Sequence, residues 1–104
     1  MNDGTDSLDD IGARLTLLRI WAGFDSQSAF ARALDVSQTE INHYERGNRR
    51  LTLTTAQKIR ARFRVTLDWL YFGDRTGLSL AVERSLPRLR DPSPDSGAGP
   101  QMSM

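Results

Sequence analysis

Hydrophobic residues recur at helical spacing over the first part of the chain. Positions i, i+4, i+7 and i+11 carry Ile11, Leu15, Leu18 and Ala22. This spacing places them on one face of an amphipathic helix. Asp9 or Asp10 can cap its start, because a carboxylate accepts hydrogen bonds from the free amide groups there, and Gly23 is typical of a helix end. We therefore expect a first helix between these capping residues and Gly23.

Two short helices separated by a tight turn are predicted next. Asp25-Ser26 is a capping signal before the segment SAFARAL, whose apolar face carries Phe30, Ala33 and Leu34. Residues 35–37 break this helix. Ser37 caps the following one, and Glu40, three positions later, completes a capping box. The third helix runs to about residues 44–46 and stops at Gly47.

The third predicted helix has two faces of different chemistry. Ile41 and Tyr44, one turn apart, form its inner face. Its outer face is left to Gln38, Thr39, Asn42, His43 and Arg46. A helix that only packs against a core does not need so many hydrogen-bonding side chains on its outer face. This face is therefore the first candidate for a binding surface.

Two more helices and the chain ends complete the predicted organisation. Thr54 or Thr55 caps TAQKIRARF, and LDWLYF forms a compact fifth helix closed by Gly73. No segment has the alternating pattern of a strand, so the predicted fold class is all-α. We expect residues 1–8 to be a disordered lead and residues 9–75 to be the domain. Residues 76–104 are expected to form at most a short helix before a disordered Pro/Gly/Ser tail.

The composition of the chain argues against disulfides, metal sites and membrane spans. The chain of 104 residues has no cysteine and one histidine, which excludes disulfides and leaves no spacing that suggests a metal site. No apolar run approaches the ~18 residues of a membrane span, and the acidic start is unlike a signal peptide. We therefore expect a cytoplasmic protein without a membrane segment, a metal or a cofactor.

The net charge of +1 conceals an uneven distribution. Residues 37–64 contain seven basic residues against two acidic ones, a local balance of +5, whereas residues 1–10 contain four aspartates and no base. A local excess of positive charge attracts an anionic partner. Charges scattered over a solvated surface are the alternative interpretation of this pattern.

Two short helices joined by a three-residue turn, the second polar outside and apolar inside, are typical of a helix-turn-helix. Residues 11–75 resemble the Xre/Cro family of lambda-repressor-like DNA-binding domains. The resemblance is carried by Arg14-Leu15, Leu18-Arg19, FARALDVSQTEINHYERG at 30–47 and TLDWLYFGD at 66–74. It implies a compact five-helix bundle, with the second helix over the DNA backbone and the third in the major groove.

The resemblance also assigns residues to the DNA interface. Gln38, Thr39 and His43 match the principal base-contacting positions, with Asn42 and Arg46 at flanking positions. Amide side chains can pair with adenine and guanidinium groups with guanine. The positions expected to meet phosphates are Ser26, Gln27, Ser37, Asn48, Arg49 and Arg50.

Other positions of the resemblance are structural. Arg19 and Glu45 match a buried ion pair between the third and first helices. Asp35 stands in the turn where the family usually has glycine, and GFDSQ at 23–27 is one residue longer than the common GLSQ. Aspartate tolerates the left-handed conformation that such a turn requires.

These observations predict a sequence-specific regulator of transcription, a repressor that is nucleoid-associated and binds double-stranded DNA as a homodimer. The chain is not expected to be an enzyme, because no acid–base pair lies in a plausible cleft. One alternative stays open: an antitoxin or protein-interaction module whose C-terminal segment, from about Leu78, binds a partner protein.

Overall fold

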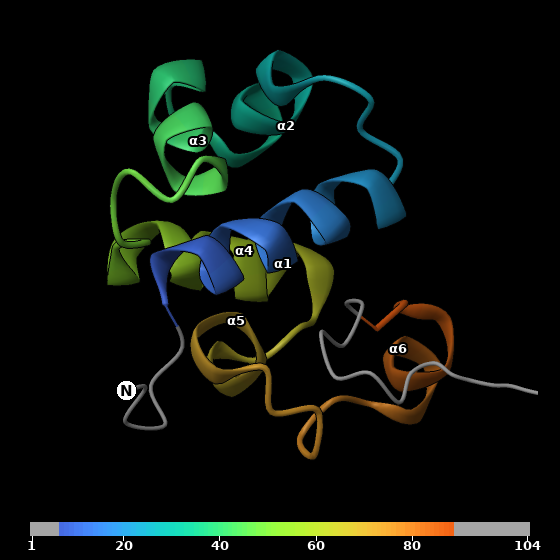
Figure 1. Ribbon diagram of the computed structural model, residues 1–104. Helices are drawn as coiled ribbons and strands as arrows, with labels where there is room; N and C mark the ends of the chain where they lie inside the picture. Colours follow the sequence, from blue (N-terminus) through green and yellow to red (C-terminus); the bar gives the residue numbers. More distant parts are fainter. Residues whose placement is uncertain (1–6, 89–104) are drawn as a thin grey trace, which may run out of the picture.

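The computed structural model describes residues 7–88, which form helices without any strand (Figure 1). The helices are α1 (Leu8–Trp21), α2 (Gln27–Leu34), α3 (Gln38–Glu45), α4 (Leu53–Phe63), α5 (Leu67–Phe72) and α6 (Leu80–Ser85). The predicted all-α class is confirmed, with six helices in the described part instead of the expected five. The expectations for residues 1–6 and 89–104 lie outside the described residues.

Every described helix begins with a serine or threonine N-cap whose hydroxyl accepts the backbone N–H three residues later. The prediction was correct at Ser26 and Ser37 and wrong at two other helices. Ser7 caps α1 in place of Asp9 or Asp10, and Asp10 completes its capping box. Thr52 caps α4 in place of Thr54 or Thr55.

The turn between α2 and α3 has the backbone conformation expected at its first residue. Asp35 is left-handed, with φ 59° and ψ 48°. The N–H of Val36 donates to the carbonyl of Ala31 and closes the end of α2. Lys58 of α4 donates from Nζ to the Asp35 carbonyl at 3.1 Å, so the turn is also held from the next helix.

The core lies where α1, α3, α4 and α5 meet, and the inner faces of the helices supply it. Ile41 and Tyr44 of α3 are buried against Leu15 and Leu18 of α1 as parts of one hydrophobic cluster. A group of three rings fixes α2 to α4: the centroids of Phe30 and Phe63 are 5.7 Å apart, and Phe24 lies 5.6 Å from Phe30. In Figure 1, α2 and α3 lie above α1, and α5 and α6 lie below it.

The folded unit extends beyond the boundary expected at residue 75. Leu78, Val82 and Leu86 belong to the hydrophobic core cluster and are at most 8 % exposed. Arg75 holds this segment by donating from Nη2 to the carbonyls of Glu83 (2.9 Å) and Leu86 (2.7 Å). Apolar residues four positions apart and one arginine therefore attach the α6 segment to the rest of the fold.

Candidate nucleic-acid interface

The outer face of α3 presents the polar side chains that the sequence singled out. Gln38, Thr39 and Arg46 are exposed, and Asn42 and His43 are half-buried, whereas the inner residues Ile41 and Tyr44 are 0 % and 1 % exposed. Positions 38, 39, 42, 43 and 46 share one side of a helix of 3.6 residues per turn. The structure thus brings all five predicted base-contacting residues together on one face.

The C-terminal end of α3 is fixed to α1 by a buried ion pair. Arg19 Nε lies 2.9 Å from Glu45 Oε2, and the two side chains are 11 % and 6 % exposed. Arg19 Nη1 also donates to the carbonyls of Phe24 and Asp25, at 3.0 and 2.9 Å. One guanidinium therefore holds both the end of α3 and the loop that leads into α2.

A glycine allows α1 and α3 to approach each other very closely. A Cβ atom at Gly12 would lie 2.4 Å from the carbonyl oxygen of Tyr44 and 2.8 Å from that of Glu45. Both neighbours are backbone atoms, so they cannot turn aside as a flexible side chain could. The absence of a side chain at position 12 sets the spacing between the two helices.

A hydrogen-bonded group that the sequence reasoning missed joins α3 to α4. The Tyr44 hydroxyl donates to the Glu40 carboxylate, and Thr55 Oγ1 donates to Glu40 Oε2 at 2.6 Å. These hydrogen bonds, the one from Thr55 first, hold the pKa of Glu40 below its ordinary value, and the charges of Arg49 and Lys58 act in the same direction. A buried tyrosine one helical turn after a glutamate is the signal that could have revealed this group, since the buried hydroxyl needs an acceptor.

The predicted capping box at the start of α3 is only half formed. Ser37 accepts the N–H of Glu40 at 3.0 Å, as expected. The Glu40 carboxylate is instead taken by Tyr44 and Thr55, so it tethers α3 to α4. Thr55, which was expected as a candidate cap of α4, serves as a donor in this contact.

The positions expected to meet phosphates lie on either side of α3. Asn48, Arg49 and Arg50 are exposed in the loop after α3, and Ser26 and Ser37 are exposed at the starts of α2 and α3. Gln27 differs, because its side-chain Nε2 donates to Glu45 Oε1 at 2.9 Å. Its side-chain amide is therefore bound to the Arg19–Glu45 ion pair. Only the backbone N–H of Gln27, in the first turn of α2, is left to meet a phosphate.

The described residues limit other kinds of site. No group of three or more His, Cys, Asp or Glu side chains within residues 7–88 could hold a metal ion. No helix in this part of the chain is long and apolar enough to cross a membrane.

A family model described as helix-turn-helix matches residues 25–70, from the loop before α2 to within α5. No curated protein and no solved structure matches the chain. The match contains both helices of the motif, their turn, and the basic loop after α3. Residues 25–70, a little under half of the chain, therefore form a helix-turn-helix domain, and this match supports the Xre and lambda-repressor type and a DNA-binding regulator of transcription.

Proposed function

We propose that the chain is a sequence-specific repressor that inserts α3 into the major groove of double-stranded DNA. The observation that carries this proposal is the outer face of α3, on which five polar side chains share one side of a helix held rigidly from behind. Repression needs no contact beyond the operator, because a bound protein excludes others from the same base pairs.

The side chains on this face suit the reading of base edges. The amides of Gln38 and Asn42 can each pair with adenine, and the guanidinium of Arg46 can pair with guanine or meet a phosphate. Thr39 and His43 complete the set. A good bidentate pair is worth about 1–3 kcal/mol of discrimination against the wrong base.

The surrounding positions would bind the phosphate backbone and set the register of α3. Arg49 and Arg50 supply charge on one side, with Asn48 beside them, and the hydroxyl of Ser37 lies at the start of α3. On the other side, Ser26 and the backbone N–H of Gln27 stand at the start of α2, where helix N-termini attract anions. Such contacts raise affinity for all sequences alike.

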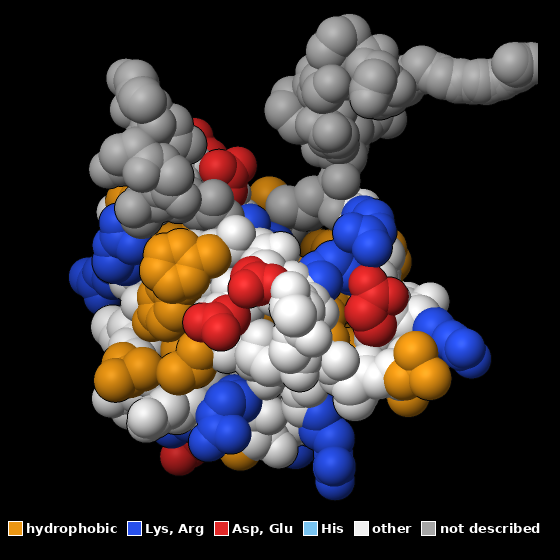
Figure 2. Space-filling view, turned by 90° about the horizontal axis from the view of Figure 1, so that it is seen from below, with side chains coloured by type: hydrophobic (Ala, Val, Ile, Leu, Met, Phe, Trp, Pro, Cys, Tyr) orange, Lys and Arg blue, Asp and Glu red, His pale blue; other side chains and the backbone are white. Residues whose placement is uncertain are grey.

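A homodimer would give this small domain a useful specificity, because a single module covers only about 600–1,000 Å² on DNA. Leu53 and Phe72 are 55 % and 54 % exposed, and Tyr71 beside Phe72 donates to the carbonyl of Leu51, next to the basic loop. On the face seen in Figure 2, hydrophobic side chains gather at one edge beside lysine or arginine side chains. A second copy that docks on the exposed side chains of Leu53 and Phe72 would give a dimer whose two α3 helices bind half-sites about 34 Å apart.

Selection of bound duplexes from a randomised DNA pool, at about 150 mM salt, tests the proposal. We expect a motif with two symmetric half-sites. A single half-site would retain base reading and remove the dimer. Failure to recover any motif, with binding lost on modest addition of salt, would remove base reading by α3.

Two substitutions with a matched control refine this test. Gln38→Ala should relax the preference at one base pair by roughly ten-fold or more, because one bidentate contact is lost. Gln57→Ala removes the same kind of side chain from the exposed surface of α4 and should leave the motif unchanged. Arg50→Ala should weaken binding to all sequences and lower the salt slope by about one.

The alternative of a protein-interaction module draws less support. In this alternative the C-terminal tail, from about residue 78, binds a partner protein, and residues 89–104 of that tail lie outside the described part of the chain. Leu78, Val82 and Leu86 are instead buried in the protein's own core, and Leu80, 66 % exposed, is the large apolar side chain of α6 that faces water. Recovery of no DNA motif is the result that would return this alternative to first place.

A further inference from the structure

The basic loop joins α3 to α4 over residues 46–52, and its backbone is fixed on both sides of two cationic side chains. Where the loop leaves α3, the N–H of Asn48 donates to a carbonyl in the last turn of that helix at 2.9 Å. Where the loop reaches α4, the Leu51 side chain is buried, at 2 % exposure. Arg49 and Arg50 lie between these two points and are exposed. The direction of both guanidinium groups therefore depends on how firmly this short stretch of backbone is held.

A tyrosine of α5 holds the same stretch from another part of the fold. The Tyr71 hydroxyl donates to the carbonyl of Leu51 at 2.8 Å, across 20 positions of sequence. Leu51 directly follows Arg50, so this hydrogen bond restrains the backbone next to that cation. Burial raises the pKa of Tyr71 above its ordinary value of 10. The phenol therefore keeps its proton at neutral pH and remains a donor.

The last residue of the loop is held by the group around Glu40. The Thr52 hydroxyl lies 3.3 Å from the Tyr44 hydroxyl and accepts the N–H of Thr55 as the cap of α4. The loop is thus linked to α3 through Tyr44 and to α5 through Tyr71. Tyr44 is 1 % exposed, whereas Tyr71 is half-buried. The Tyr71 hydroxyl can therefore be removed with less disturbance of the core.

We infer that Tyr71 is a positioning residue for DNA binding, which fixes the basic loop through the Leu51 carbonyl so that Arg49 and Arg50 meet the phosphates of one strand. This inference rests on the proposed function, because it needs the loop to lie against the DNA backbone. A loop that is already ordered loses less conformational entropy when its side chains bind. The Tyr71 hydroxyl thus contributes to affinity without touching the DNA, and it contributes alike for all base sequences.

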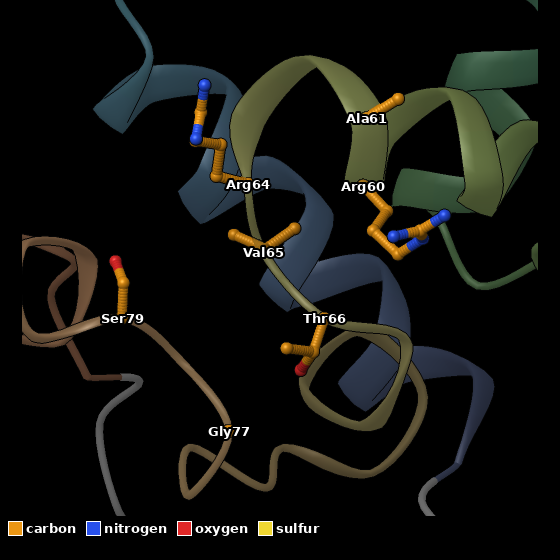
Figure 3. A pocket seen from close by; sticks show the side chains of 7 residues that line it. All are labelled: Arg60, Ala61, Arg64, Val65, Thr66, Gly77 and Ser79. Atoms are coloured by element: carbon orange, nitrogen blue, oxygen red, sulfur yellow. The ribbon is translucent and has the colours of Figure 1, made fainter.

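The arginines at the end of α4 offer a contrast. In Figure 3 the side chains of Arg60 and Arg64 point away from each other around an open depression that Gly77 and Ser79 also line. Their charges are presented in separate directions, whereas the two arginines of the basic loop are adjacent on one restrained stretch of backbone. Arg60→Ala removes one positive charge from the surface without altering the basic loop, so it is a matched control.

Binding of the full chain to a mixed-sequence duplex of about 30 base pairs, long enough for two half-sites, tests the inference. The dissociation constant is measured over a series of salt concentrations, because the slope reports the number of phosphate contacts. Tyr71→Phe should weaken binding by about three- to ten-fold, the equivalent of one hydrogen bond. It should also lower the salt slope by about one. The base motif selected from a randomised pool should stay unchanged.

A double-mutant cycle at low salt separates positioning from a general loss of stability. In a chain that carries both Arg49→Ala and Arg50→Ala, Tyr71→Phe should change the affinity by less than about two-fold, because no cation is left in the loop to position. In the Arg60→Ala chain, Tyr71→Phe should keep its full effect. A merely structural tyrosine would act equally in both backgrounds.

Ser79→Ala controls for lost stability. The Ser79 hydroxyl accepts the N–H of Val82 at 3.3 Å as the cap of α6, away from the basic loop. Its removal should lower the melting temperature about as much as Tyr71→Phe does, and it should leave duplex binding unchanged. In the DNA-free protein, NMR order parameters of residues 49–51 should fall in Tyr71→Phe and stay constant in Ser79→Ala.

Two results would overturn the inference while leaving the proposed function intact. One is an unchanged affinity and salt slope in Tyr71→Phe when the parent protein binds the duplex. The other is an equal effect of Tyr71→Phe in the Arg60→Ala chain and in the chain without the two loop arginines. Failure of the parent protein itself to bind the duplex would contradict the proposed function together with the inference, so the two kinds of failure are distinguished by the parent protein.

Discussion

Two arginines, Arg19 and Arg75, each bind the end of another helix, but their carboxylate partners differ in exposure to water. Arg19 binds the carboxylate of Glu45 and the carbonyls of Phe24 and Asp25. Arg75 binds the carboxylate of Glu83 together with carbonyls at the end of α6. The guanidinium groups are similarly buried, at 11 % and 12 % side-chain exposure, but the carboxylates are 6 % and 33 % exposed.

This difference decides what each contact does. A buried carboxylate has lost its water, so removal of its partner leaves a charge that nothing else can solvate. A carboxylate with a third of its surface in water can be solvated again when its partner leaves, and Glu83 also has Arg88 at 3.1 Å. The end of α3 is therefore held by a contact that is costly to break, and α6 by one that is easier to release.

The largest effect is expected from the buried pair. Glu45→Ala should lower the free energy of unfolding by about 3–5 kcal/mol, because the Arg19 guanidinium is left buried without its partner. Denaturant unfolding followed by circular dichroism measures the change. Asp68→Ala, at an exposed position of α5, is the control and should change stability by less than about 0.5 kcal/mol. A loss below about 1 kcal/mol in Glu45→Ala would show that the pair is no more costly to break than a surface pair.

A smaller and more local effect is expected at the other arginine. Arg75→Ala should cost about 1–2 kcal/mol, because charge-assisted hydrogen bonds to the carbonyls of α6 are lost. Hydrogen exchange should accelerate over residues 80–86 and stay unchanged over α3. Arg84→Ala, at an exposed position of the same helix, should change neither the stability nor the rate of hydrogen exchange. Equal acceleration in α3 would contradict the view that the two contacts act independently.

The smallest effect is expected at acidic pH, where Glu83 loses its charge. The hydrogen bond from Arg75 holds the pKa of Glu83 below its ordinary value of 4.5, and the charge of Arg88 adds to this. A carboxyl group whose pKa is lowered by folding contributes stability above the unfolded pKa, and this contribution is lost as the pH falls through the folded pKa. The stability difference between the parent protein and Glu83→Gln should therefore shrink on acidification below the ordinary value. A difference that is constant with pH would mean that the Glu83 charge plays no part.

Much of the fold could be predicted because capping residues and helical spacing are local signals. Ser26 and Ser37 were recognised as caps, since each stands directly before a periodic segment. The start of α4 was predicted wrongly, at Thr54 or Thr55, because these threonines are as acceptable as caps as Thr52, which caps the helix in the structure. The choice depends on a tertiary contact, the hydrogen bond from Thr55 to Glu40. Contacts between distant parts of the chain are invisible to local rules.

The same limit applies to the candidate site. The polar face of α3 follows from its spacing, but the use of the Gln27 amide does not, because Gln27 meets Glu45 across 18 positions of sequence. The α6 segment was expected to be at most a short helix. Its burial depends on Arg75, whose partners lie 8 and 11 positions further along the chain.

The close approach at Gly12 has a consequence for the DNA itself. With the carbonyls of Tyr44 and Glu45 against the backbone of α1, α3, which we propose as the reading helix, has no room to move closer to α1 when it meets an imperfect groove. A reading surface that cannot adjust leaves the duplex as the partner that must bend or twist. The energy of such deformation depends on base steps that the protein never touches. Base pairs outside the reach of α3 would then contribute to operator choice through the stiffness of the double helix.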